Sequence, residues 1–400
     1  MWRSTARASR GPSPSWPERL KSVLILGGGA IGSAIAAHLA ALRPALDIAV
    51  IERDPSYAQA SSARSAASIR QQFSTPLNIA LSQYGLELLR ALGPQAGLVE
   101  QGYLYLATPA GAAQLASQQA LQRSLGADIE LLEPGALRRR WPWLATQDLA
   151  LGAWGRSGEG WFDGWGLLQH FRQRAQALGV RYLAEEAVAL ERDAAGALAG
   201  VRLRSGPLLR ADLHVLACGA WSGALAATAG LAVPVSGKRR SVYAFHTPER
   251  AAGCPLVIDP SGLWFRPEGE GQFICGGPPL DAADPDGLPL DPEPDLFEER
   301  LWPALAARVP GFETLRQQRA WAGYYEMNGF DHNGLVGPLA ACPNLLLACG
   351  FSGHGLQHAP GVGRGLAEWI AFGAYRSLDL TPLAPARIAA GRPCLEHNII

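Results

Sequence analysis

The chain has 400 residues, of which 48% are hydrophobic and 18% charged, and its formal net charge is zero. This length suggests two domains, and the hydrophobic fraction is enough for a large core. Because the chain has neither net positive charge nor a basic block, neither a nucleic acid nor an anionic membrane surface is expected as its main partner.

The N-terminal segment, residues 1–20, is rich in Ser, Pro and Arg and has no acidic residue before Glu18. We expect a flexible tail here. One interpretation is a disordered tail on a cytoplasmic protein. The other is a presequence that directs the protein to the mitochondrial matrix, since presequences have a similar charge bias.

A glycine-rich turn follows the first apolar strand. Residues 23–26 have strand character, and Gly27, Gly29 and Gly32 follow in the pattern G-x-G-x-x-G before a helical pattern that ends near Leu42. In a dinucleotide-binding unit the first glycine makes the tight turn and the second lets a pyrophosphate approach the backbone. The third glycine lets helix and strand pack closely.

The start of this helix is expected to bind phosphates. The amides of Ala30 and Ile31 lack helical partners, and the helix dipole is positive at this end. A second apolar strand, residues 48–51, ends at Glu52, 20 residues after Gly32. A carboxylate there accepts hydrogen bonds from a ribose diol, so the pattern predicts a dinucleotide-binding βαβ unit.

Two other interpretations of these residues are less favourable. Gly28 and Gly32 also form a G-x-x-x-G pair, which is typical of transmembrane helices. However, three consecutive glycines and a strand that ends in Glu52-Arg53-Asp54 do not suit a membrane span. We expect no integral membrane protein. We also expect no metal site, because the six cysteines and eight histidines form no ligand pattern.

The remaining segments alternate between strand and helix patterns. We expect helices at 75–92, 111–125, 165–178 and 361–372, strands at 102–107, 213–217 and 345–348, short strands around Tyr182, Val188 and Val201, and an antiparallel region at 241–278. Pro360 suits the first turn of the last helix.

Strands at 213–217 and 345–348 return late to a nucleotide-binding unit that starts early, which predicts an α/β fold with a discontinuous domain. The predicted parts are a Rossmann-like FAD-binding domain (21–95, 155–232 and 331–384), an inserted antiparallel β-sheet substrate domain of α+β type (96–154 and 233–330), and a C-terminal tail (385–400).

The motifs together resemble the D-amino-acid oxidase superfamily of flavoenzymes, most of all its sarcosine oxidase and glycine oxidase branch. The resemblance is carried by the Gly27 turn, Glu52-Arg53, residues 61–70, residues 217–222 (ACGAWS) and residues 350–355 (GFSGHG). Residues 321–328, 331–334, 353–361 and 398–400 are closer still to a subgroup of FAD-dependent oxidoreductase-domain proteins, one of which is linked to assembly of respiratory complex I.

The resemblance implies FAD as the cofactor. Ser61 and Ser62 should lie at its pyrophosphate, the backbone of Val188 at its adenine, and Gly219 and Trp221 near the nucleotide. Val188 and Trp221 could instead be ordinary core residues. The full set that the motifs assign to the cofactor is Gly27, Gly29, Ala30, Ile31, Gly32, Glu52, Arg53, Ser61, Ser62, Val188, Gly219, Trp221, Gly350, Gly353, His354, Gly355, Leu356 and Gln357.

The turn Gly353-His354-Gly355 precedes the last helix, so its amides can face the flavin N1–C2=O edge. The ring of His354 either serves the site or is structural and turned away. Relatives with covalent flavin use a cysteine in the segment that matches 321–331. This chain has none there, so we expect non-covalent FAD.

The resemblance implies three catalytic residues, Arg70, Tyr325 and His354. Arg70 matches the family arginine that binds a substrate carboxylate, although it could also cap the helix near Thr75 or pair with a surface acid. Tyr325 matches a tyrosine that lines the substrate pocket. Gln357 replaces a lysine that helps bind the carboxylate in some relatives, so the substrate could be less acidic or held differently.

The expected reaction is oxidation of the C–N bond of an amino acid or a sarcosine-like N-alkyl amino acid, with hydride transfer to flavin N5. We expect a dehydrogenase that passes electrons to a quinone or an electron-transfer protein. The reason is that the only lysines are Lys21 and Lys238, and Ile274 stands where oxygen-reducing relatives hold a lysine. The alternatives are an oxygen-using oxidase and a non-catalytic FAD-binding assembly factor.

Overall fold

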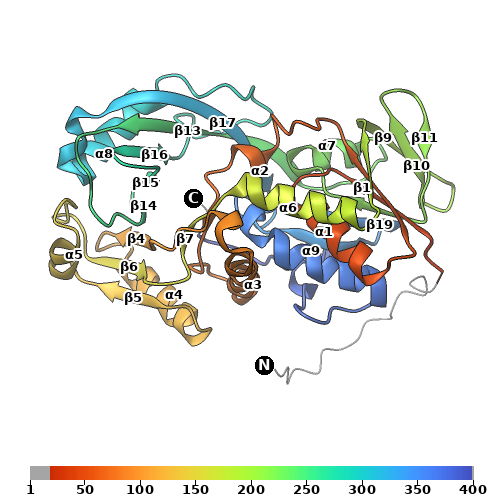
Figure 1. The fold of residues 1–400 in the computed structure, drawn as a ribbon, viewed down its shortest axis with the longest axis horizontal. Helices are drawn as coiled ribbons and strands as arrows, with labels where there is room; N and C mark the ends of the chain where they lie inside the picture. Colours follow the sequence, from red (N-terminus) through yellow and green to blue (C-terminus); the bar gives the residue numbers. More distant parts are fainter. Residues whose placement is uncertain (1–18, 399–400) are drawn as a thin grey trace.

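The computed structural model describes residues 19–398, which form two lobes around two large sheets (Figure 1). The tail expected over 1–20 therefore lies almost entirely outside the described residues. In this view the long strands of one lobe extend over the top of the other (Figure 1).

The first lobe is built on a six-stranded sheet with the order β18-β19-β12-β1-β2-β8. All its pairs are parallel except β18 with β19. Its strands are β1 (Ser22–Leu26), β2 (Asp47–Glu52), β8 (Arg181–Ala184), β12 (Leu213–Leu216), β18 (Leu335–Leu339) and β19 (Cys342–Cys349). The predicted Rossmann-like unit, with its late-returning strands, is confirmed.

The two faces of this sheet are covered differently. In β1, Val23 and Ile25 pack against helices, whereas Leu24 and Leu26 pack toward a three-stranded sheet, because successive side chains of a strand point to opposite faces. The helices are α1 (Ala30–Leu42), α3 (Pro76–Leu92), α6 (Gly164–Ala177) and α9 (Gly355–Phe372). The other face carries β9 (Ala187–Arg192), β10 (Leu198–Leu203), β11 (Leu208–Leu209) and α7 (Ser222–Ala227).

The second lobe is built on an eight-stranded sheet with the order β17-β13-β16-β15-β14-β4-β6-β5. Its pairs are antiparallel except β14 with β4. Its strands are β4 (Tyr103–Ala107), β5 (Ile129–Leu132), β6 (Leu151–Gly155), β13 (Val235–His246), β14 (Leu256–Ile258), β15 (Trp264–Pro267), β16 (Gln272–Gly276) and β17 (Arg316–Asn328). The predicted antiparallel sheet is thus present and joins two distant segments of the chain.

One face of this sheet is an aromatic core. Phe245, Phe273 and Phe312 contact one another with ring centroids 4.9–5.5 Å apart, and short helices cover them. Val242 and Trp264 belong to a cluster on the other face and line a cavity between the lobes.

The remaining helices and strands are α2 (Ser61–Arg64), β3 (Ser68–Ile69), α4 (Ala112–Ser124), α5 (Pro134–Arg140), β7 (Gly160–Trp161), α8 (Trp302–Arg308) and α10 (Ala386–Ala389).

The last long helix begins earlier than expected. α9 starts at Gly355, and Pro360 lies inside it rather than in its first turn, so the prediction for this boundary is wrong. The turn before it, closed by a hydrogen bond from the His354 amide to the Phe351 carbonyl (3.0 Å), already directs the chain along the helix. Because Pro360 has no amide hydrogen, the Leu356 carbonyl loses the helical hydrogen bond that it would otherwise accept.

The segment expected as a C-terminal tail is packed against the rest of the chain. Arg387 is buried and pairs with buried Asp331 (2.6 Å between Nε and Oδ2). Further along, Glu396 accepts hydrogen bonds from the amide (2.9 Å) and hydroxyl (2.7 Å) of Ser74, just before α3. These contacts bring the segment to Arg70, whose Nη2 donates to the carbonyl of Asn398 (2.5 Å).

No helix within residues 19–398 combines the length and apolar character needed to cross a membrane. In these same residues no three His, Cys, Asp or Glu side chains lie together in an arrangement that could hold a metal ion.

Candidate active site

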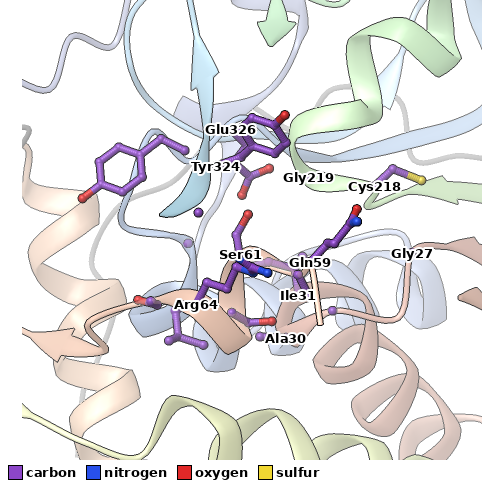
Figure 2. Close-up of a pocket in the computed structure, with 18 of the residues that line it drawn as sticks. Gly27, Ala30, Ile31, Gln59, Ser61, Arg64, Cys218, Gly219, Tyr324 and Glu326 are labelled. Atoms are coloured by element: carbon purple, nitrogen blue, oxygen red, sulfur yellow. The ribbon is translucent and has the colours of Figure 1, made fainter. Parts of the chain in front are cut away.

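A cavity of about 490 Å³ lies between the two sheets. Figure 2 shows Ala30, Ile31 and Ser61 on one of its sides and Tyr324 and Glu326, from β17, on the other. The first group comes from the starts of α1 and α2, and the second from the long strand that crosses both lobes. The cavity thus has walls from both lobes.

The glycines of the first turn have the roles that their spacing predicts. Gly27 has φ +96°, and a Cβ there would lie 2.3 Å from the carbonyl oxygen of Ala217. A Cβ on Gly32 would lie 1.9 Å from the carbonyl oxygen of Gly27, so Gly32 permits the close packing of helix on strand and does not line the cavity. Gly29 does line it, and a Cβ there would meet only Ser62 Oγ, at 3.9 Å.

Glu52 lies at the end of β2 and lines the cavity. Its carboxylate accepts hydrogen bonds from the amides of Gly28 (2.9 Å) and Asp54 (3.0 Å), which fix its orientation. Burial raises the pKa of Glu52. A carboxylate held in this way has lone pairs left for ribose hydroxyls.

Trp221 is part of the cavity wall, together with Val188 and Gly219. The guanidinium of Arg53 lies over its ring, with Cζ 3.8 Å from the centroid. The ring of Tyr324 meets it edge-on at 5.5 Å. The resulting Arg53–Trp221–Tyr324 contact links the Rossmann-like lobe to β17.

These residues fit the nucleotide part of FAD. The free amides at the start of α1 and the hydroxyls of Ser61 and Ser62 suit a pyrophosphate, and Glu52 suits a ribose. At the other end, Gly353 has φ +95°, and a Cβ there would lie 2.4 Å from Cε2 of Tyr325, so the turn before α9 approaches β17 as closely as a glycine allows. Leu356 and Gln357, in the first turn of α9, also line the cavity.

Glu326 is a cavity residue that the sequence analysis missed. Its Oε2 accepts a hydrogen bond from the Gly350 amide (2.9 Å), which explains the place of Gly350 behind the cavity wall rather than in it. Burial raises the pKa of Glu326 to about 7. A single carboxyl group in the otherwise uncharged run 320–328 was the signal that could have identified it.

The ring of His354 is not among the groups that line the cavity in the described part of the chain. It packs against Phe73 (5.4 Å between centroids) and His358 (5.0 Å), and its Nε2 lies 3.5 Å from Oδ1 of Asn333. Burial, followed by the charge of Arg70, lowers the pKa of His354 to about 3, so the ring is neutral. This geometry gives no support to a catalytic role for the side chain.

Arg70 is buried but lines the cavity, away from the part that fits the nucleotide of FAD. We call this other part the substrate end. Its Nη1 donates to the carbonyl of Gln72 (2.7 Å) and its Nη2 to the carbonyl of Asn398 (2.5 Å). Its Cζ lies 4.0 Å from the centroid of the Phe73 ring. Arg70 neither caps α3 nor pairs with a surface acid, so two carbonyls and a ring fix its guanidinium.

The backbone that carries Arg70 is also held in place. The Arg70 amide donates to Oε1 of Gln357 (3.0 Å). Fully buried Glu159 accepts from the amides of Gln71 (2.5 Å) and Gln72 (3.1 Å), and burial raises its pKa to about 7. Gln357, where some relatives have a lysine, therefore supports Arg70 through its side-chain oxygen.

Tyr325 and Arg240 complete the substrate end. Arg240, on β13, has its Cζ 5.5 Å from the centroid of the Tyr325 ring. Burial raises the pKa of Tyr325, and the nearby charges of Arg240 and Arg70 oppose this rise. Tyr103 and Trp264 add walls. The sequence analysis did not identify Arg240, because strand pairing decides which side chains of β13 face the cavity.

Comparison with known proteins agrees with this site. Residues 22–369 match the family described as FAD dependent oxidoreductase (DAO). The chain is 38% identical to FAD-dependent oxidoreductase domain-containing protein 1 of Bos taurus, across 96% of this chain and 88% of that protein. It is 28% identical to 4-methylaminobutanoate oxidase (formaldehyde-forming) of Paenarthrobacter nicotinovorans, across 89% of this chain and 44% of that protein.

Among solved structures, L-proline dehydrogenase from P. horikoshii has a TM-score of 0.81 at 24% identity, covering 94% of this chain and 99% of that one. This similarity shows a common fold. The resemblance expected from the motifs is confirmed, and with it FAD as the cofactor. The chain belongs to the DAO family of FAD-dependent oxidoreductases.

Proposed function

We propose that this FAD-dependent oxidoreductase oxidises the C–N bond of an amino acid or N-alkyl amino acid. The observation that carries the proposal is the fixed guanidinium of Arg70 beside Tyr325, at the far end of a cavity whose other end fits a dinucleotide. The name of the Paenarthrobacter relative, an oxidase of an N-methylated amino acid, supports the same class of substrate.

In this proposal Arg70 binds the substrate carboxylate. Its planar fork suits a carboxylate, and its contacts with the carbonyls of Gln72 and Asn398 orient it before substrate arrives. Tyr325 forms the wall against which the substrate lies. Together they fix the position of the carbon attached to nitrogen, and the bound FAD supplies the hydride acceptor.

The substrate nitrogen reacts as a neutral amine. Arg70 and Arg240 place two positive charges at this end of the cavity, and a buried ammonium beside them is unfavourable, so the pocket favours the unprotonated form. The lone pair of the neutral amine is what drives loss of hydride. Apolar walls such as Trp264 and Val242 exclude water from the reacting carbon.

We propose further that the enzyme is a dehydrogenase. Ile274 is buried in β16, and Lys238, on β13, pairs with Asp286 (2.8 Å between Nζ and Oδ1). Among the described residues no lysine lines the cavity. The cavity wall in the described part of the chain therefore has no counterpart of the lysine with which oxygen-reducing relatives stabilise developing superoxide.

The test is anaerobic mixing of FAD-loaded protein with amino acids and their N-methyl derivatives, followed by loss of the flavin absorbance. Loss with at least one carboxylate-bearing amine supports the proposal. If every amine in a broad panel fails, C–N oxidation is refuted and a non-catalytic, FAD-binding assembly role takes its place.

The choice of electron acceptor has its own test. Substrate-reduced enzyme is mixed with air-saturated buffer in a stopped-flow cell, and reoxidation is followed. Slow reoxidation by oxygen and fast turnover with quinones or dyes are expected. Rapid formation of peroxide would identify an oxidase.

A further inference from the structure

The substrate end of the cavity contains a second arginine, to which the proposed reaction assigns no ligand. Arg240, on β13, lines the cavity as Arg70 does, and its Cζ lies 5.5 Å from the centroid of the Tyr325 ring. The charges of both arginines act on Tyr325, which places them at the same end of the cavity. An α-amino acid with one carboxylate needs one guanidinium. A second, largely buried guanidinium requires its own anion, because an unpaired buried charge is costly.

The anion now paired with Arg240 comes from an exposed loop. Asp284 contacts Arg240 with both carboxylate oxygens, at 2.8 Å each. It lies in the segment 279–293 between β16 and the helical turns before α8, where most residues from 281 to 289 are exposed. Its backbone is left-handed (φ +46°), a conformation that Asp and Asn adopt more readily than most residues.

The loop is held mainly by polar contacts along β13. Lys238 donates to the carbonyl of Asp284 and pairs with Asp286, and Ser236 donates to Asp286 (2.7 Å). The loop therefore keeps anchors beside Arg240 even when the Asp284 carboxylate leaves it. Replacement of the Asp284 carboxylate by a ligand carboxylate leaves the charge of Arg240 paired, so the exchange avoids the cost of an unpaired, largely buried charge.

We propose that Arg240 is a second anion-binding residue of the substrate site and that Asp284 occupies it until a ligand carboxylate displaces it. This inference rests on the proposed function and narrows its substrate to a secondary amine with two carboxylates. One carboxylate binds Arg70 and the other Arg240, with the C–N bond between them beside Tyr325. In the complex the second carboxylate of the substrate neutralises the charge of Arg240, as Asp284 does in the free protein.

The test uses two unreactive ligands and the flavin spectrum of FAD-loaded protein. Thiodiacetate has two carboxylates and (methylthio)acetate has one, and in both a sulfur replaces the amine nitrogen, so neither can be oxidised at a C–N bond. Titration followed by the flavin absorbance gives a Kd for each. We expect thiodiacetate to bind more tightly by about tenfold, the contribution of one charge-assisted hydrogen-bonded contact.

Three variants locate the effect. Arg240→Gln should abolish the preference for thiodiacetate and leave the Kd of (methylthio)acetate within about twofold. Asp284→Asn, which tolerates the left-handed backbone, should strengthen thiodiacetate binding severalfold because the competing carboxylate is gone. Arg239→Gln is the matched control, since Arg239 points away from the cavity toward Glu293 (3.9 Å) and should change neither Kd.

The proposal is overturned if the unmodified protein binds both ligands equally, or if Arg240→Gln weakens both by the same factor. These outcomes leave the proposed C–N oxidation intact as long as a monocarboxylic amine reduces the flavin. If neither ligand perturbs the flavin and no amine reduces it, the proposed function itself fails. The two failures are therefore distinguishable.

Discussion

The two ends of the cavity are formed by different parts of the chain, the backbone at one end and long side chains at the other. The nucleotide end uses backbone: a turn with φ +96° at Gly27, the amides at the start of α1, and small side chains on α2. The substrate end uses long side chains, of which Arg70 and Arg240 come from segments 170 residues apart. The first end recognises a constant group through geometry. The second recognises a variable group through charge.

This difference predicts how each end responds to change. A backbone site fails when a single atom is added, whereas a side-chain site loses one interaction at a time. The four predictions below test this comparison, beginning with the largest effect.

Gly32→Ala should destabilise the protein by about 3 kcal/mol or more, because its Cβ would lie 1.9 Å from a backbone oxygen that cannot move alone. Thermal unfolding and the FAD content after gel filtration measure this effect. Gly29→Ala is the control, since its Cβ meets only Ser62 Oγ at 3.9 Å. It should fold normally and bind FAD more weakly. Equal melting temperatures for the two variants would contradict the packing role of Gly32.

Arg70→Gln should raise KM for a carboxylate-bearing amine about 100-fold, the loss of a charged hydrogen-bonded contact in a buried site. The FAD content should stay near that of the unmodified protein, because Arg70 lies at the other end of the cavity from Glu52. Steady-state kinetics with a dye acceptor measures KM. An unchanged KM in a folded, FAD-loaded variant would remove Arg70 from carboxylate binding.

Glu159→Gln should change how stability depends on pH. Burial raises the pKa of Glu159 from 4.5 to about 7 in the folded protein, so the folded state holds a proton that the unfolded state has lost between these values. The unmodified protein should therefore lose stability relative to Glu159→Gln as pH rises from about 4.5 to 7, on the order of 3 kcal/mol, with no further change above. Denaturant unfolding at several pH values measures the difference. A constant difference across this range would contradict the buried carboxyl.

Trp221→Leu should have the smallest effect. It removes the ring beneath Arg53 and leaves an apolar side chain, at a cost of about 0.5–1 kcal/mol. The Kd for FAD, measured by quenching of flavin fluorescence, should rise only a few-fold. A loss of FAD binding as complete as that expected for a glycine variant would show that this end also depends on individual side chains.

The same difference explains what the sequence could predict. The glycine turn, the helix after it and the place of Glu52 follow from short spacings, because all of them lie within one βαβ unit. The side chains of Arg240 and Glu326 enter the cavity only because β13 and β17 pair in one register, which residue spacing does not reveal.

His354 and Pro360 show a second limit. A glycine-rich turn before a helix indicates where amides point, but the orientation of the His354 ring depends on Phe73, which is distant in sequence. The start of α9 at Gly355 similarly depends on the preceding turn. This turn places Pro360 inside the helix, although proline is usually found in the first turn of a helix.

The strand order of the six-stranded sheet has a consequence for folding. β1, near residue 22, pairs with β12 near 213, which in turn pairs with β19 near 345. A growing chain on the ribosome therefore holds β1 without one of its permanent neighbours until about half of the polypeptide has been made. Such distant pairings slow folding and leave strand edges exposed in the meantime. We expect refolding to be slow and prone to aggregation, and added FAD to act after β1 and β12 have met rather than as an early template.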